Sequence, residues 1–277
     1  MKEVRDMYNE KIIDSDSYIE VYDYQTPVYP RRSKKSEDDP SNCFLDEQLS
    51  QKRTFDELSA IEQYDSLKRK SKHYKHMRFE IARLVDLNFD HNTKFLALTF
   101  KENIANIAYA NGEFEKFIKR LNYSVFKTKK AKLKYLATWE KQLRGAIHYH
   151  IILFSFPYID FNKLSKIWGY GFVKINKIDV DAKENRGRYI SKYFDKDLEL
   201  KDHKKKAFFK SRNLKVPSVT KTMVDETVDT SDYEILHSNT YTLKQPIFSD
   251  SQSTNENGLE FTNITVQYHK LKKQTRK

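Results

Sequence analysis

The stretch between residues 132 and 156 constrains the fold of this chain more than any other. It contains two apolar runs, KLKYLATWE and IHYHIILFSF, with the glycine-bearing segment LRGA between them. Two strand-like runs joined by a short segment with a glycine are typical of a β-hairpin. We therefore expect residues 132–140 and 147–156 to form adjacent antiparallel strands.

Strand-like and helix-like patterns alternate on both sides of this hairpin. A short apolar run at 94–100 favours a strand, and residues 113–123 place large apolar side chains on one helical face. An amphipathic helix (161–169), a strand (171–178) and a further helix (185–198) are expected to follow. This order predicts an α+β domain, in which helices pack against a mainly antiparallel sheet.

Changes in composition divide the chain into four segments. Residues 1–54 are polar, with prolines, serines and charges of both signs, and are expected to be a flexible arm. Residues 55–91 have the apolar spacing of a helix, and residues 92–217 hold the α+β domain. Residues 218–277 are rich in Thr, Ser and Asp, so we expect a weakly structured polar extension with room for one or two strands.

The charge of the chain favours a polyanionic partner. There are 51 Lys and Arg residues against 39 Asp and Glu, a formal net charge of +12, which suits nucleic acid first and an anionic membrane second. The first half of the helical segment is strongly basic and could contact backbone phosphates, although a solvated helix face would show the same pattern. The candidates for nucleic-acid contact are Lys68, Arg69, Lys70, Lys72, Lys75 and Arg78.

Composition also limits the kinds of site and the compartment. The single cysteine, Cys43, can form neither a disulfide framework nor a thiolate zinc site, and it is consistent with a reducing compartment. The sequence has no apolar run long enough to span a membrane and no secretion signal at its start, so a cytoplasmic protein is expected. It also lacks the GxxxxGK[ST] pattern of a P-loop motor.

Two histidines stand one residue apart in the second strand of the expected hairpin. Side chains two positions apart on a strand point to the same face, so His148 and His150 should lie side by side. Two neutral nitrogen ligands on a rigid strand are half of a metal site, although two structural histidines would have the same spacing. Across the hairpin, Glu140 is the candidate for an oxygen ligand and Gln142 is its competitor. Such a site leaves coordination positions open and can polarise a phosphoryl oxygen.

The helix expected at 185–198 carries a second group of chemically active side chains. Tyr189 and Tyr193 are four residues apart and hence on one face, and Lys192 and Lys196 have the same separation on an adjacent face. A tyrosine oxygen is a good nucleophile at phosphorus when a cation lowers the cost of its charge, and lysines can neutralise phosphate charge. A tyrosine pair that packs on the sheet would have the same spacing.

Three motifs in this order, FLALTF, HYHIILF and YISKYFDKD, resemble those of rolling-circle replication initiators of the HUH endonuclease superfamily. The resemblance covers about residues 92–217, which are similar to plasmid- and phage-type replication-associated proteins of low-GC bacteria. It implies a five-stranded antiparallel sheet of ferredoxin-like or RRM-like lineage and Mg²⁺ or Mn²⁺ as the cofactor. The residues that match the motifs are Glu140, His148 and His150 as metal ligands, Tyr189 and Tyr193 as nucleophiles, with Tyr189 expected to act first, and Lys192 and Lys196 as the accompanying lysines.

The activity implied by the resemblance is metal-dependent nicking and joining of DNA. The enzyme would cut single-stranded or cruciform origin DNA, form a 5′-phosphotyrosine and leave a free 3′-hydroxyl. Host polymerase and helicase are the implied partners, in the cytoplasm of a bacterial host cell. A relaxase or a single-strand transposase would share the metal pair and the tyrosine. A non-catalytic basic nucleic-acid-binding protein, with tyrosines that stack on bases, is the alternative from another class.

Overall fold

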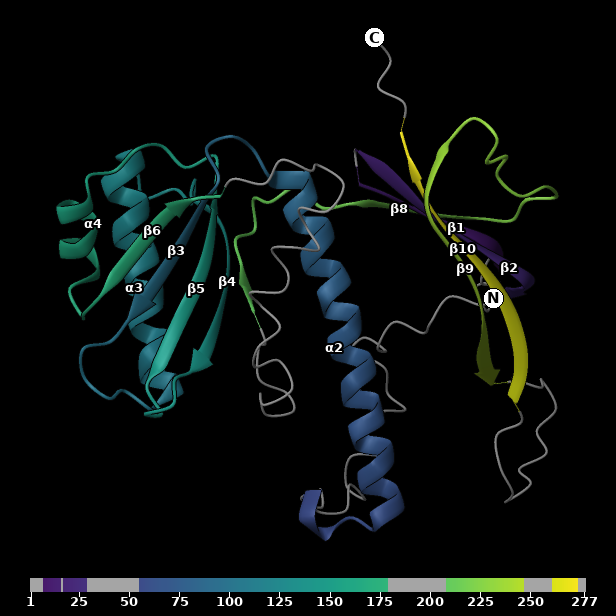
Figure 1. Cartoon of the computed structure of the whole chain (residues 1–277), viewed down its shortest axis with the longest axis horizontal. Helices are drawn as coiled ribbons and strands as arrows, with labels where there is room; N and C mark the ends of the chain where they lie inside the picture. Colours follow the sequence, from purple (N-terminus) through teal and green to yellow (C-terminus); the bar gives the residue numbers. More distant parts are fainter. Residues whose placement is uncertain (1–6, 16, 29–54, 179–207, 247–260, 274–277) are drawn as a thin grey trace, which may run out of the picture. The chain divides into compact units, whose positions relative to one another are not determined.

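The computed structural model describes residues 7–15, 17–28, 55–178, 208–246 and 261–273. The chain divides into two compact units (Figure 1). The first combines residues 1–57 with 217–277, and the second comprises residues 58–216. The second unit contains the predicted α+β domain together with the basic helix that precedes it.

A five-stranded antiparallel sheet forms the centre of the second unit, as predicted. Its strands lie in the order β6-β3-β5-β4-β7. The central pair is the expected hairpin, in which Glu140 of β4 lies directly opposite His148 of β5. Gly145 forms its turn with a positive φ of 85° that a glycine adopts without strain. The strands are β3 (Lys94–Thr99), β4 (Lys134–Lys141), β5 (Ile147–Phe154), β6 (Val173–Lys177) and β7 (Phe209–Lys210).

Two helices, α3 (Ile107–Phe126) and α4 (Phe161–Trp168), cover one face of this sheet (Figure 1). The face is apolar because every second residue of β5 contributes a large buried side chain. Phe114 of α3 stacks on Tyr149 of β5 with ring centroids 4.6 Å apart. Asn111 accepts a hydrogen bond of 2.7 Å from the Tyr149 hydroxyl, so the one polar atom of this ring is satisfied in the core.

The opposite face is covered only in part. The helix α2 (Ala60–Asn88) follows the short helix η2 (Phe55–Glu57) and begins at Ser59, which forms a capping box with Glu62. The second half of α2 packs against the end of the face formed by Ile152 and Phe154 of β5. None of the residues 60–73 in the first half of α2 is buried. None of the described helices is long and apolar enough to cross a membrane.

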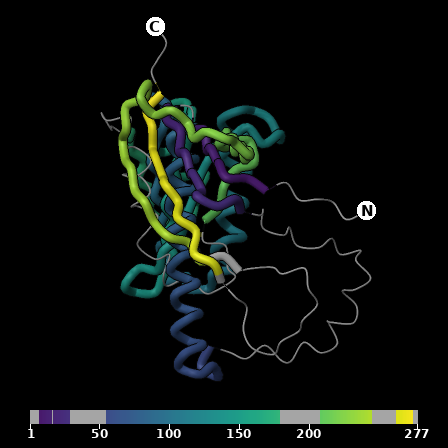
Figure 2. The backbone as a smooth tube through the Cα atoms, turned by 90° about the vertical axis from the view of Figure 1, so that its right-hand side faces the viewer, coloured from purple at the N-terminus to yellow at the C-terminus, as the bar shows by residue number. Residues whose placement is uncertain are grey.

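The first unit is a finding that the sequence did not predict. Residues expected to be a flexible arm form β1 (Tyr8–Asp14) and β2 (Tyr18–Val28). Residues expected to be a polar extension form β8 (Ser218–Thr222), β9 (Glu234–Pro246) and β10 (Phe261–Lys272). These strands make a second five-stranded antiparallel sheet in the order β8-β1-β2-β10-β9. Figure 2 traces the N-terminal strands in purple and their C-terminal partners in green and yellow.

This second sheet escapes sequence analysis because its pairings join the two ends of the chain. Tyr22 of β2, for example, lies opposite Tyr268 of β10, and their ring centroids are 4.9 Å apart. The core of the unit is small, with fully buried side chains at Val21, Val266 and Leu271. Many of its other strand residues are polar, and the composition of each segment by itself therefore resembles that of a loop.

Candidate metal centre

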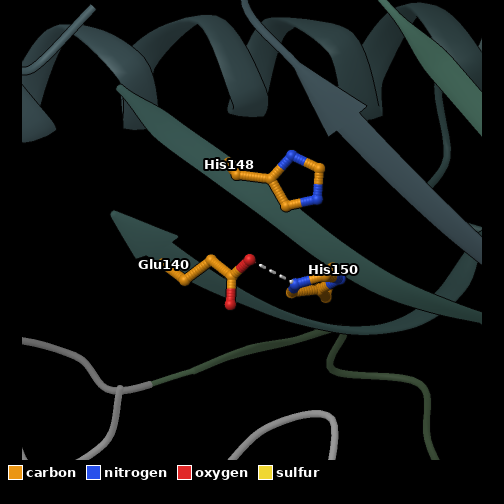
Figure 3. Close-up of side chains that lie close together, drawn as sticks. All are labelled: Glu140, His148 and His150. Carbon is orange, nitrogen blue, oxygen red and sulfur yellow. Dashed lines mark ion pairs between the residues drawn. The ribbon is translucent and has the colours of Figure 1, made fainter. Parts of the chain in front are cut away.

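The β4–β5 hairpin brings Glu140, His148 and His150 together on the face that α2 leaves open, as Figure 3 shows. One ligand atom from each residue can be chosen so that all three lie within 4.8 Å of one another. The Nε2 atom of His150 is 3.1 Å from Oε1 of Glu140, and the two imidazole rings are 4.6 Å apart between centroids. The juxtaposition expected from the hairpin and from the spacing of the histidines is therefore present.

A third strand orients one of these imidazoles. Thr99, the last residue of β3, lies opposite His148 in the sheet, and its hydroxyl oxygen is 2.7 Å from Nδ1 of that ring. This contact occupies Nδ1, so Nε2 of His148 is the nitrogen left for a metal ion. Polar partners of this kind hold a metal-ligating histidine in one orientation and one tautomer. The sequence analysis missed Thr99, because its role depends on the β3–β5 register.

Burial keeps the His148 imidazole neutral. The surrounding protein lowers the pKa of this ring from 6.5 to about 4, mainly because burial disfavours its charged form. His150 lowers this pKa further, and the Glu140 carboxylate opposes the shift. A neutral imidazole has a free lone pair, so His148 can bind a metal ion at pH 7 without first releasing a proton.

The donor set fits a divalent cation. It offers two imidazole nitrogens and one carboxylate oxygen, the ligand types that such ions take in open catalytic sites. The side chains of His150 and Glu140 are 16% and 23% exposed, which leaves room for solvent or substrate at the remaining positions. Phe95 lies against the His150 ring with centroids 5.6 Å apart. The Nδ1 atom of His150 is buried and has no hydrogen-bond partner among the described residues.

We predict that His148 of the metal-free protein titrates with a midpoint near pH 4. Glu140→Gln should move the midpoint lower, because it removes the charge that favours the imidazolium. His150→Ala should move it upward, because it removes a neighbour that disfavours it and admits water. NMR titration of the imidazole carbon-bound protons, with chelator present, measures all three. A midpoint at or above 6.5 in the unsubstituted protein would contradict the burial of this ring.

The other predicted site residues have different standings. Tyr189, Tyr193, Lys192 and Lys196 lie outside the described residues, so their position relative to the triad stays a prediction. The predicted nucleic-acid contacts all lie on α2. Their side chains are exposed at Lys68, Arg69, Lys72 and Lys75 and half-buried at Lys70 and Arg78. Exposure is compatible with phosphate contact, and that role also stays a prediction.

Comparison with known proteins assigns the segment that holds the triad. Residues 93–198 match the model of a replication-associated protein family, the ORF2 type. The match begins just before β3, includes Glu140, His148 and His150, and extends through the segment with Tyr189 and Tyr193. No curated protein and no solved structure matches the chain. The segment 93–198 is therefore similar to this family of replication-associated proteins, which supports a replication initiator.

Proposed function

We propose that this protein initiates rolling-circle replication by nicking and rejoining one strand of DNA at a plasmid or phage origin. The observation that carries the proposal is the Glu140–His148–His150 triad on an open sheet face, inside a segment that matches a replication-associated family. The formal charge of +12 suits a DNA substrate.

The triad would hold Mg²⁺ or Mn²⁺ through one carboxylate oxygen and two imidazole nitrogens. When bound, such a cation supplies a Lewis acid that polarises a phosphoryl oxygen of the scissile phosphodiester. The protein's own contribution is to keep the donors ready. The Thr99 hydroxyl fixes the ring of His148, and burial keeps that ring neutral at pH 7.

A tyrosine hydroxyl is the proposed nucleophile. Tyr189 Oη would lose its proton and attack phosphorus, so that a Tyr–O–P bond forms and the bond between phosphorus and the 3′ oxygen breaks. The departing oxygen takes up a proton and becomes a free 3′-hydroxyl. The phosphotyrosine conserves the phosphodiester, and the strand can be rejoined by the reverse transfer. Lys192 and Lys196 would neutralise charge on the phosphate, and Tyr193 would perform the second transfer.

The free 3′-hydroxyl is the primer that replication needs. A host polymerase would extend it while a host helicase opens the duplex, in the cytoplasm of a bacterial cell. After one round, attack on the regenerated origin by the second tyrosine would release a single-stranded circle. The origin would be presented as a single strand or as a cruciform, because the nucleophile must reach an unpaired strand.

A covalent adduct is the direct test of this proposal. The full chain is incubated with Mn²⁺ and a library of labelled single-stranded oligonucleotides that contains candidate origins, then separated on a denaturing gel. We expect a labelled protein band that chelator prevents, with mass mapping of the nucleotide to Tyr189 or Tyr193. Binding of the oligonucleotides without any adduct would overturn the nicking function and favour a non-catalytic DNA-binding protein.

A further inference from the structure

A groove of about 1010 Å³ lies in the second unit, at the edge of the sheet where β7 pairs with β4. Its walls come from the second half of α3, from the chain between α3 and β4, and from β7 with the residues that follow it. Its lining includes the basic residues Lys119, Arg120, Lys129, Lys210 and Arg212. None of the described residues that line it is acidic. We call it the basic groove.

The basic groove and the metal centre open on opposite faces of the sheet. Tyr135 lines the groove and belongs to the alternating set of β4 residues that packs toward α3. Glu140 belongs to the other set, which shares its face with α2. Side chains five positions apart on a strand point to opposite faces, so the two places cannot hold the same phosphate. The groove is thus separate from the proposed nicking site.

Buried amide side chains hold the walls of the groove in place. Asn122 of α3 is 6% exposed and makes four hydrogen bonds of 2.9 Å with backbone groups of residues 128–133. Two backbone carbonyls accept from its Nδ2, and two backbone amides donate to its Oδ1. All the hydrogen-bonding capacity of one side chain is therefore used to fix the lysine-rich connection between α3 and β4.

The opposite wall is fixed in a similar way. Ser211 and Tyr135 exchange two hydrogen bonds of 3.0 Å. The Nδ2 atom of Asn213 donates to the carbonyls of Ala131 and Lys132 at 3.2 and 3.1 Å. These contacts tie the chain after β7 to the connection after α3. A groove whose walls are already ordered loses less conformational entropy when it binds a flexible ligand.

The positive charge in the groove is only partly compensated. Lys210 pairs with Glu80 at 2.7 Å, and Nε of Arg120 donates to a backbone carbonyl. Lys119, Lys129 and Arg212 have no carboxylate partner within the described part of the chain. Glu115 is near enough to contribute to the raised pKa of Tyr135, so one negative charge lies close by. The three uncompensated cations outnumber it.

An exposed aromatic ring lies among these cations. Tyr123 lines the groove and is 57% exposed. Cations that can follow a phosphate backbone, together with an exposed ring that can stack on a base, are the two elements of sites for single-stranded nucleic acid. An acidic protein segment would satisfy the cations but would leave the ring without a specific role. The charge and the ring together favour a DNA strand.

We propose that the basic groove binds the sugar–phosphate backbone of single-stranded DNA, with Lys119, Lys129 and Arg212 on phosphates and Tyr123 stacked on a base. This second site would hold part of the strand away from the metal centre. The inference rests on the charge and the architecture of the groove, and it holds whether or not the protein nicks DNA.

The test compares two triple variants of the full chain that change charge equally. The groove variant is Lys119→Glu, Lys129→Glu and Arg212→Glu. The matched control is Lys163→Glu, Lys166→Glu and Lys177→Glu, whose side chains are exposed and do not line the groove. Affinity for a fluorescent oligothymidylate, which has no sequence preference to satisfy, is measured by anisotropy over a range of salt concentrations.

We expect the groove variant to bind at least tenfold more weakly than the control at moderate salt. The slope of log K against log salt should decrease by about 2, as expected for three lost contacts with a single strand. Tyr123→Ala should weaken binding about fivefold or more without changing this slope. A glutamine version of the groove variant, checked by circular dichroism, guards against misfolding and should show the same reduced slope. Equal losses in both triple variants, or an unchanged affinity in the groove variant, would overturn the proposal.

Discussion

Replacing His148 or His150 by alanine should abolish formation of the DNA adduct. Each substitution removes one of the three ligand atoms that lie within 4.8 Å of one another. Two remaining ligands hold a divalent cation weakly, so we expect Mn²⁺ affinity to fall by roughly 100-fold or more. Glu140→Ala should raise the metal concentration that the reaction requires, because it removes the one anionic ligand. Calorimetric titration with Mn²⁺ and the denaturing-gel assay measure the two effects.

A tyrosine variant separates loss of metal from loss of the nucleophile. Tyr189→Phe combined with Tyr193→Phe should also give no adduct, yet it should bind Mn²⁺ and oligonucleotide as tightly as the unsubstituted chain. An adduct that persists in this double variant would refute the assignment of the nucleophile. Full adduct yield in His148→Ala at low Mn²⁺ would refute the triad as the metal centre.

Thr99 gives an intermediate case, because it acts through another residue. Thr99→Val keeps all three ligands but removes the hydroxyl that lies 2.7 Å from Nδ1 of His148. We expect metal affinity to fall by about 10- to 100-fold, the range for partners that orient metal ligands. Thr99→Ser keeps the hydroxyl and should retain most of the affinity. Equal affinities for the valine and serine variants would show that the hydroxyl does not orient His148.

Local patterns were sufficient to predict the second unit. The hairpin needs only the two apolar runs and the turn between them, and its register then places Glu140 opposite His148. The helical spacing in α3 marks the side chains that the structure buries, such as Phe114 and Phe117. These signals are strong because each element buries a continuous apolar face on a neighbour that is close in sequence.

The parts that could not be predicted depend on contacts between distant segments. β1 and β2 are completed by β8 and β10, and nothing within residues 1–54 indicates those partners. Thr99 meets His148 across a separation of 49 residues. The walls of the basic groove meet through Ser211 and Tyr135, which are 76 residues apart. Apolar periodicity shows which face of an element is buried, but it does not show which element covers that face.

One glycine of the second unit has no room for any side chain. A Cβ atom at Gly171 would lie 2.4 Å from the carbonyl oxygen of Thr99 and 2.5 Å from the amide nitrogen of Lys101. The backbone is close because residues 170–172 bond to residues 99–101, with Thr99 donating to Phe172 at 2.9 Å and Lys101 to Tyr170 at 2.8 Å. Gly171→Ala should therefore destabilise the second unit by about 3 kcal/mol, since backbone atoms must move apart. Metal affinity should fall as well, because the displaced residue is Thr99.

Gly112 is the matched control, with the opposite sign. It lies inside α3, and a Cβ atom there would meet nothing within 4 Å. Gly112→Ala should stabilise the second unit by up to about 1 kcal/mol, because alanine favours the helix over the unfolded chain. Both tryptophans of the chain, Trp139 and Trp168, lie in the second unit, so their fluorescence during urea unfolding reports on this unit rather than on the first. If Gly171→Ala unfolds at the same urea concentration as the unsubstituted chain, residues 99–101 and 170–172 are not packed as closely as described. If it unfolds earlier while Gly112→Ala unfolds later, the close approach that positions Thr99 beside His148 is confirmed.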